Sequence, residues 1–154
     1  MIDSKRIETD IEFAVALAKS NSNPTFIGRL DSGWAFLGLN QVLTGCCFLV
    51  ADPIVAGIEE LSALEKTVFF DDMLVLGRAI QTVTGAVRVN YLFLGNKDPV
   101  LHVHIVPRFA DEPEEYRSRG PWHYPNYVKF ELARDQALVE ALAQEILKPR
   151  GKAV

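Results

Sequence analysis

Apolar residues recur along the first half of the chain with two different periods, and each period predicts a different kind of element. Spacings of three and four residues favour an amphipathic helix over about residues 4–20, with a stripe formed by Ile7, Ile11, Ala14, Val15 and Ala18. Three short β-prone runs follow at 26–30, 34–39 and 46–50, separated by turn residues. Because the connections are short, we expect neighbouring strands to pair antiparallel.

The second half begins with a long helix. Ser62 and Glu65 form a capping-box pattern, and the apolar positions after them lie on one helical face as far as about Gly85. Two strand-like runs, 87–94 and 101–109, are joined by the polar residues 95–99 and predict a hairpin. Helical spacing returns over about 131–147. This order, without alternating strands and crossover helices, predicts an α+β domain with an antiparallel sheet.

Composition narrows the function classes. The 154 residues, 49% of them apolar, suit a single domain over 1–154. The net charge of −4 predicts no nucleic-acid partner and no membrane partner, so an anionic ligand needs a local site. No apolar run is long enough to span a bilayer and the N-terminal segment is charged, which favours a cytoplasmic protein. Cys46 and Cys47 are adjacent in a predicted strand, so a disulfide between them is not expected.

Two of the three histidines carry the candidate chemistry. His102 and His104 are two residues apart in a β-rich run and therefore point to the same face of the sheet. Val100 and Val106 share that face, and the alternate residues Leu101, Val103 and Ile105 are expected to pack against a helix. The strand is thus apolar on one face and chemically active on the other.

A His-x-His pair alone leaves three interpretations open. The imidazoles are a hydrogen-bonded structural pair, or they are two ligands of a metal site that still needs further ligands. In the third interpretation one imidazole attacks phosphorus, and the other donates a hydrogen bond to the phosphoryl oxygens.

The residues around the pair resemble a known signature. The segment from Gly95 to Arg108, which reads GNKDPVLHVHIVPR, is similar to the motif of the histidine triad superfamily, in which three histidines alternate with apolar residues. Aligned on Pro107-Arg108, the nucleophilic histidine falls on His102 and the third histidine on His104, and the first falls on Val100, a departure from the motif. The resemblance covers about 26–122. It implies a five-stranded antiparallel sheet with the long helix on one face, plus the N- and C-terminal helices.

The resemblance also assigns roles outside the histidine strand. Asn40 matches the position that binds the ribose hydroxyls, while Asn90, Asn96 and Lys97 match positions that contact phosphate. Independently, an asparagine within a β-prone strand, as at Asn90, is disfavoured and calls for a reason. Further departures from the pattern are Gly45-Cys46 in place of Gly-His and Ala51-Asp52 in place of Pro-Lys or Pro-Arg. Trp122 and His123 are expected near the active-site rim, and Arg108 is expected at a surface or interface.

A nucleotide hydrolase or transferase is the activity that the resemblance implies. His102 attacks the α-phosphorus of a nucleoside phosphate to give a nucleotidyl-histidine, with no metal and no cofactor, in a protein that forms a homodimer. Dinucleoside polyphosphates, nucleoside phosphoramidates, aminoacyl adenylates and nucleotide sugars all offer that phosphorus. The alternatives are a non-catalytic nucleotide-binding protein with a degenerate triad, a metal-binding protein that uses the His-x-His pair, and a structural or interaction domain.

Overall fold

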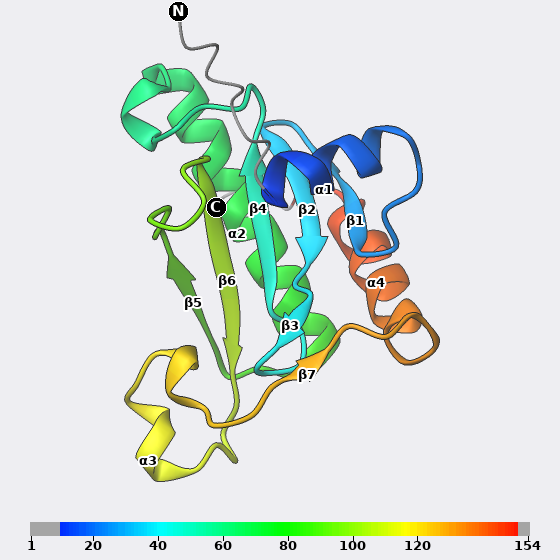
Figure 1. Ribbon diagram of the computed structural model, residues 1–154, viewed down its shortest axis with the longest axis vertical. Coiled ribbons are helices and arrows are strands. Elements are labelled where there is room, and N and C mark those ends of the chain that lie inside the picture. The colour runs from blue at the N-terminus through cyan, green and yellow to red at the C-terminus, as the bar shows by residue number, and fades with distance from the viewer. Residues whose placement is uncertain (1–9, 151–154) are drawn as a thin grey trace, which may run out of the picture.

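The structure is a computed structural model that describes residues 10–150, so Ile7 and the first part of the expected N-terminal helix lie outside the described residues. It contains the following helices, 3₁₀ turns and strands in chain order (Figure 1): α1 Asp10–Lys19, β1 Phe26–Leu30, β2 Gly33–Leu37, β3 Asn40–Gln41, β4 Cys47–Ala51, η1 Ile58–Glu60, α2 Ala63–Thr84, β5 Arg88–Leu92, β6 His102–Arg108, α3 Glu114–Arg117, η2 Pro121–His123, β7 Val128–Lys129 and α4 Leu132–Ile146. No described helix is both long and apolar enough to cross a membrane.

Five strands form the main sheet in the order β1-β2-β4-β6-β5, and every neighbouring pair is antiparallel. The predicted α+β class is confirmed. The hairpin predicted from 87–94 and 101–109 is also confirmed as the pair β5 and β6, although β5 ends at Leu92. The strand expected at 34–39 is shorter, because β2 ends at Leu37 and the chain then turns into β3.

The long helix α2 begins and ends at the predicted signals. Ser62 Oγ accepts a hydrogen bond from the Glu65 backbone N–H at 3.3 Å, and the Glu65 carboxylate accepts one from the Ser62 N–H at 2.7 Å. At the other end, Gly85 adopts a left-handed conformation with φ of 75°, which ends the helix without strain on a side chain. These local features fix the residues at which α2 begins and ends.

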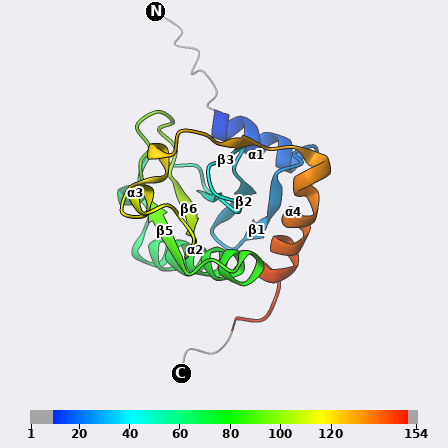
Figure 2. The same cartoon turned by 90° about the horizontal axis from the view of Figure 1, so that it is seen from below.

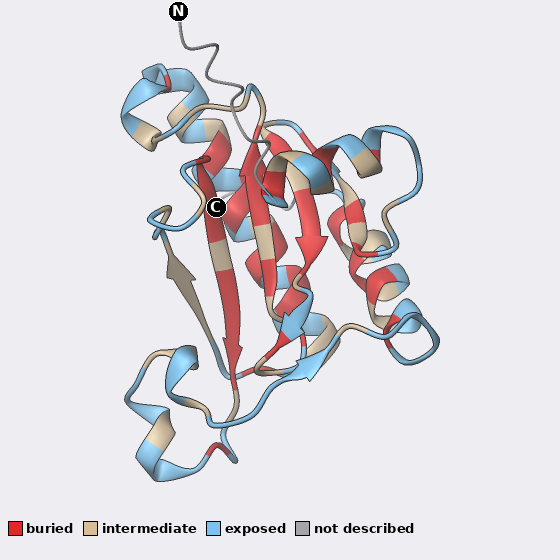
Figure 3. Ribbon diagram, viewed as in Figure 1, coloured by how far each residue is buried: buried red, intermediate tan, exposed pale blue. Residues whose placement is uncertain are grey.

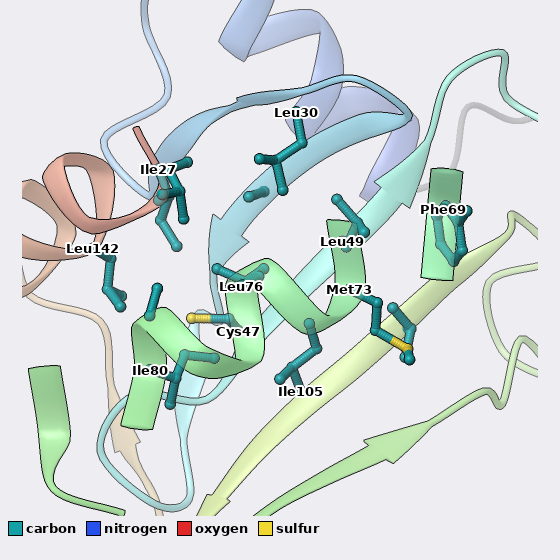
Figure 4. Close-up of a cluster of buried hydrophobic side chains, with 14 of the residues drawn as sticks. Ile27, Leu30, Cys47, Leu49, Phe69, Met73, Leu76, Ile80, Ile105 and Leu142 are labelled. Carbon is teal, nitrogen blue, oxygen red and sulfur yellow. The ribbon is translucent and has the colours of Figure 1, made fainter. Parts of the chain in front are cut away.

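The main core lies between one face of the sheet and the helices α2 and α4. Figure 4 shows the side chains that meet there, from the helices and from β1, β4 and β6. On β6 the inward residues are Val103 and Ile105, both fully buried, which confirms the predicted alternation along this strand. Figure 3 shows how the burial concentrates along the central strands.

A second, smaller core lies on the opposite face, beneath α1. Figure 2 shows α1 and α2 on opposite sides of the sheet. Val15 and Ala18 of α1 pack there with Phe36, Val50 and Val100 from the sheet. This is the face that carries the histidines, so α1 covers part of the sheet next to them.

A segment after β6 crosses the lower end of the sheet, as Figure 1 shows. It includes α3 and η2 and ends in β7, which pairs with β3 to form a separate two-stranded sheet. The backbone N–H of Phe130 also donates to the carbonyl of Leu39 at 2.7 Å. The sequence patterns did not predict this small sheet, which ties the segment to the end of β2.

Candidate functional site

The two histidines meet on the α1 side of β6. His104 lies opposite Phe48 of β4 and Leu92 of β5, and His102 lies opposite Val50. Their Nε2 atoms are 3.1 Å apart, and the rings meet edge to face with centroids 4.8 Å apart. The predicted pairing of the imidazoles on one face is thus present in the structure.

A backbone carbonyl fixes the tautomer of His102. Its Nδ1 lies 2.6 Å from the carbonyl oxygen of Val100. Because a carbonyl oxygen only accepts hydrogen bonds, Nδ1 carries the proton of the neutral ring and Nε2 carries a lone pair. The Nε2 of His104 must then supply the hydrogen in the bond between the two rings.

Burial sets the charge state of His104. Burial and the neighbouring His102 lower the pKa of His104 from 6.5 to about 4. At neutral pH the ring is therefore uncharged and has one N–H to donate. The pair consequently presents one lone pair, on His102, and one donor, on His104.

A row of aromatic side chains holds His104 from the side. His104, Phe48, Phe36 and Phe26 lie opposite one another on successive strands, with ring centroids separated by 6.4, 5.1 and 5.6 Å. Such cross-strand contacts stabilise the sheet and limit the rotation of each ring. Of this row, His104 and Phe48 line the adjacent cavity and form its floor, whereas Phe36 is fully buried in the core beneath α1.

A cavity of about 680 Å³ opens between this floor and α1. His104, Phe48 and Phe13 line it, and so does Trp122 of η2. Most of its lining is apolar, and Asp10 is the only charged residue among the described residues that line it. Such a space suits a flat, largely uncharged group such as a nucleobase.

Asn40 lines the same cavity, at the start of β3. Its neighbour Gln41 is buried and fixes the local backbone: the Gln41 amide donates to the carbonyls of Gly38 and Cys46 at 2.7 and 2.9 Å and accepts from the Gly45 N–H at 2.8 Å. Cys46 also lines the cavity, and burial raises the pKa of its thiol to about 11, so it is a neutral group there. The structure thus brings Asn40 and His104 to one cavity.

The other predicted ligands lie elsewhere. Asn96 and Lys97 are exposed in the β5–β6 connection and do not line the cavity. In that connection it is Asp98 that makes a structural contact, because its carboxylate accepts a hydrogen bond from the Ile11 N–H of α1 at 3.1 Å. Asn90 lines a neighbouring cavity, and its Oδ1 accepts a hydrogen bond from Arg108 at 3.2 Å. His123 is exposed and lines neither of these two cavities.

Arg108 is buried, contrary to the surface or interface position expected from the sequence, with 7% of the residue exposed. Its Nε and Nη2 donate to the two carboxylate oxygens of Glu112 at 2.9 and 2.7 Å, and other N–H groups donate to the carbonyls of Tyr116 and Arg119. Tyr124 adds a hydrogen bond to Glu112. Burial raises the pKa of Glu112, but the hydrogen bonds from Arg108 and Tyr124 outweigh it and leave that pKa below its ordinary value.

This ion pair matters for the site because it holds the segment that carries Trp122. The sequence carries no local signal for this pair, because a spacing of four residues brings charges together on a helix and Arg108 is the last residue of a strand. Within residues 10–150, no group of three His, Cys, Asp or Glu side chains converges in a way that could hold a metal ion.

The sheet order, the long helix on one face and the histidine pair on the other together define a histidine-triad fold. Solved histidine triad proteins share it. One from Bradyrhizobium japonicum is 22% identical, with a TM-score of 0.68 over 82% of this chain and 95% of that one. One from Sinorhizobium meliloti is 20% identical, with a TM-score of 0.68 over 86% and 94%.

A third neighbour is described as a hypothetical histidine triad nucleotide-binding protein, from Sulfolobus tokodaii. It is 16% identical to this chain, with a TM-score of 0.69 over 87% of this chain and 91% of that one. No protein-family model and no curated protein matches the sequence. The similarity to solved structures confirms at the level of fold the resemblance seen in the sequence.

Proposed function

We propose that this chain binds a nucleoside phosphate and transfers its nucleotidyl group through His102 to water or another acceptor. The observation that carries the proposal is the hydrogen bond from His102 Nδ1 to the Val100 carbonyl, at 2.6 Å. It places the ring proton on Nδ1 and the lone pair on Nε2, so that Nε2 can act as the nucleophile without a charged base once the His104 N–H turns to a phosphoryl oxygen.

The reaction has two steps. In the first, the Nε2 lone pair of His102 forms a bond to the α-phosphorus, and the bond to the leaving group breaks and takes its electron pair with it. In the second, water attacks the same phosphorus, the P–N electron pair returns to Nε2, and the water proton passes to solvent. The products are a nucleoside monophosphate and the free leaving group.

His104 stabilises the charge on phosphorus during both steps. In the structure its Nε2–H points at His102 Nε2, 3.1 Å away. A phosphoryl oxygen that enters between the rings accepts this N–H instead, and the same movement frees the His102 lone pair. Donors placed in this way typically contribute about 10²–10³ in rate.

Valine at the first triad position is compatible with this chemistry. The group at position 100 that contacts the nucleophile is the backbone carbonyl, which valine supplies as well as histidine does. The Val100 side chain points into the core beneath α1 and is 1% exposed. Valine in place of the first histidine therefore affects the packing beneath α1 and leaves the hydrogen bond that orients His102 in place.

The nucleoside is proposed to lie in the apolar cavity under α1. Its base rests against Phe48 and α1, and Asn40 hydrogen-bonds the ribose hydroxyls. Phe48 and Asn40 line the cavity together with His104, which supports this binding mode.

A homodimer is proposed from one exposed apolar surface. Phe93, next to the edge strand β5, lies with its ring 5.9 Å from that of Phe70 on α2, and Leu74 is exposed one turn along the same helix. An edge strand beside an apolar helix face is a surface that two copies can share. A cytoplasmic location stays a prediction.

A second candidate is a nucleotide-binding protein without turnover. It is favoured by the burial of His102, which is 5% exposed and whose Nε2 is hydrogen-bonded to His104. Under this candidate the cavity binds a nucleotide, but the lone pair of His102 stays occupied by His104.

The decisive experiment measures nucleoside monophosphate release from diadenosine tetraphosphate, an adenosine phosphoramidate and a nucleotide sugar, with a metal chelator present. We expect wild type to release product, His102→Ala to lose release by at least a thousandfold, and His123→Ala to behave as wild type. Added imidazole should partly restore release in His102→Gly. Nucleotide binding with no release from any of the three substrates would favour the second candidate.

A further inference from the structure

A second cavity, of about 530 Å³, lies beside the one that contains His104. It covers β5, the end of β6 and the segment that holds η2, and it shares Leu92, Pro121 and Trp122 with the first cavity. Four arginines line it, Arg88, Arg108, Arg117 and Arg119, against one acidic residue, Glu112. We call it the arginine cavity.

Most of this positive charge is uncompensated. Glu112 pairs with Arg108, so those two charges offset each other. Arg117 donates to the backbone carbonyls of Ala110 and Glu112 and forms no ion pair within residues 10–150. The side chains of Arg88 and Arg119 form neither a hydrogen bond nor an ion pair among the described residues, and Arg119 contributes only its backbone carbonyl to the Arg108 cluster.

Within residues 10–150, three of the four guanidinium groups around this recess form no ion pair, which is unusual in a chain of net charge −4. Concentrated positive charge in a recess attracts anions, and guanidinium groups match phosphate oxygens in geometry. Asn90 adds a polar group to the lining, because within the described part of the chain its side chain is engaged through Oδ1 alone, by Arg108. The chemistry of the arginine cavity is therefore that of a phosphate site.

Its position relates it to the catalytic pair. His104 lies opposite Leu92, Val106 opposite Asn90, and Arg108 opposite Arg88. Asn90 and Arg88 are two and four residues from Leu92, which lies opposite His104. At about 3.3 Å per strand residue, they lie about 7 Å and about 13 Å from His104 along the strand direction. An anion there is too far away to be the phosphate that His102 attacks, but it is within reach of a long leaving group.

We propose that the arginine cavity is a subsite for the distal phosphates of the leaving group. The inference rests on the proposed function and selects a substrate class for it: nucleoside phosphates whose leaving group carries further phosphates, as in dinucleoside polyphosphates. The nucleoside lies in the apolar cavity, the α-phosphorus lies at the histidines, and the chain of phosphates passes Trp122 into the arginine cavity.

The test is equilibrium binding in a His102→Ala background, which prevents turnover. Diadenosine tetraphosphate, adenosine monophosphate and inorganic tripolyphosphate are titrated into this protein and into the same protein carrying Arg88→Gln and Arg119→Gln. These two side chains make no described hydrogen bonds, so their replacement leaves the Arg108 cluster intact. A charge-matched control carries Lys66→Gln and Arg78→Gln, both on α2 on the opposite face of the sheet.

We expect the double arginine variant to weaken diadenosine tetraphosphate binding about tenfold or more and to leave adenosine monophosphate binding within twofold. Tripolyphosphate binding should weaken in parallel, and the control should change none of the three. Equal weakening of both nucleotides, or no weakening of diadenosine tetraphosphate, overturns the proposal. A loss confined to tripolyphosphate also overturns it, because it would indicate a site for free phosphate.

This readout is separate from that of the proposed function, which depends on product release through His102. If wild type releases nothing, the selective loss of diadenosine tetraphosphate binding still supports the subsite. If wild type releases product and the arginine variants bind both nucleotides as before, the subsite fails while the nucleophile stands.

Discussion

Val100 has two separate roles, because its side chain packs in the core and its backbone carbonyl contacts His102, and a substitution changes only the first. The side chain is 1% exposed and packs beneath α1, whereas the carbonyl accepts the hydrogen bond from His102. Val100→Ala removes two buried carbon atoms and leaves a small cavity, so we expect the free energy of unfolding to fall by about 2–3 kcal/mol. Val100→His restores the residue of the motif but places a larger, polar ring in an apolar site, which should cost about 2–5 kcal/mol.

Neither variant should alter the chemistry of the molecules that stay folded. The carbonyl at position 100 is present whatever the side chain, so His102 keeps its proton on Nδ1. Urea unfolding followed by tryptophan fluorescence gives the stability. The ¹⁵N chemical shifts of the His102 ring give the tautomer, and nucleoside monophosphate release per folded molecule gives the activity.

Two results would refute this reasoning. The first is Val100→Ala moving the proton of His102 to Nε2 or lowering release tenfold in folded protein, since the side chain would then act on the nucleophile. The second is Val100→His raising release strongly with no loss of stability, because the missing histidine would then be a lost catalytic group.

Three further outcomes are expected. The pKa of His104 is lowered from 6.5 to about 4 in the folded state, so between these pH values the unfolded state binds more protons than the folded state. The free energy of unfolding therefore falls as the pH falls from 6.5 to 4. In urea unfolding, wild type should lose about 2 kcal/mol more than His104→Gln across that range. Glu112→Gln leaves the charge of Arg108 buried and should cost about 3 kcal/mol in thermal or urea unfolding, against less than about 1 for Glu131→Gln, whose ion pair with Arg134 is exposed; equal losses would contradict the buried-pair argument. Phe93→Glu should convert a dimer to a monomer in sedimentation, and an unchanged mass would exclude this surface as the interface.

The elements that the sequence predicted well are those with local signals. The helix α2 is defined by the reciprocal hydrogen bonds of Ser62 and Glu65 and by Gly85, all within reach of the helix ends. The histidine strand is defined by alternation alone, since residues two apart must share a face. For the same reason the meeting of His102 and His104 could be predicted without the tertiary structure.

The elements that escaped prediction depend on contacts between distant segments. The strands β3 and β7 have two residues each, too few for alternation to be visible, and they exist because Asn40 and Gln41 meet Lys129 and Val128. The burial of Arg108 depends on the path of the segment after β6, which folds back over its guanidinium group. A charged residue at a strand end is usually exposed, so the local sequence predicted a surface position for Arg108, which is in fact buried.

The surroundings of the residues that the resemblance assigns to phosphate also depend on distant contacts. The resemblance assigned Asn90, Asn96 and Lys97 to phosphate, and the structure engages Asn90 with Arg108 while leaving the other two exposed outside both cavities. Which polar groups converge depends on the register of β5 against β6 and on the segment that carries Arg119. Neither can be deduced from the spacing of residues along the chain.

The two cavities differ in charge, and this difference favours one orientation of the proposed substrate. Among described residues, the cavity beneath α1 has no cationic lining residue, whereas the arginine cavity has four. A polyanion in the reverse orientation would place its phosphates against Phe13 and Asp10, where burial without a counter-charge is costly. The separation of an apolar recess, which His104 lines, from a cationic recess therefore favours one orientation of the proposed substrate, with the nucleoside beside His104 and the distal phosphates among the arginines.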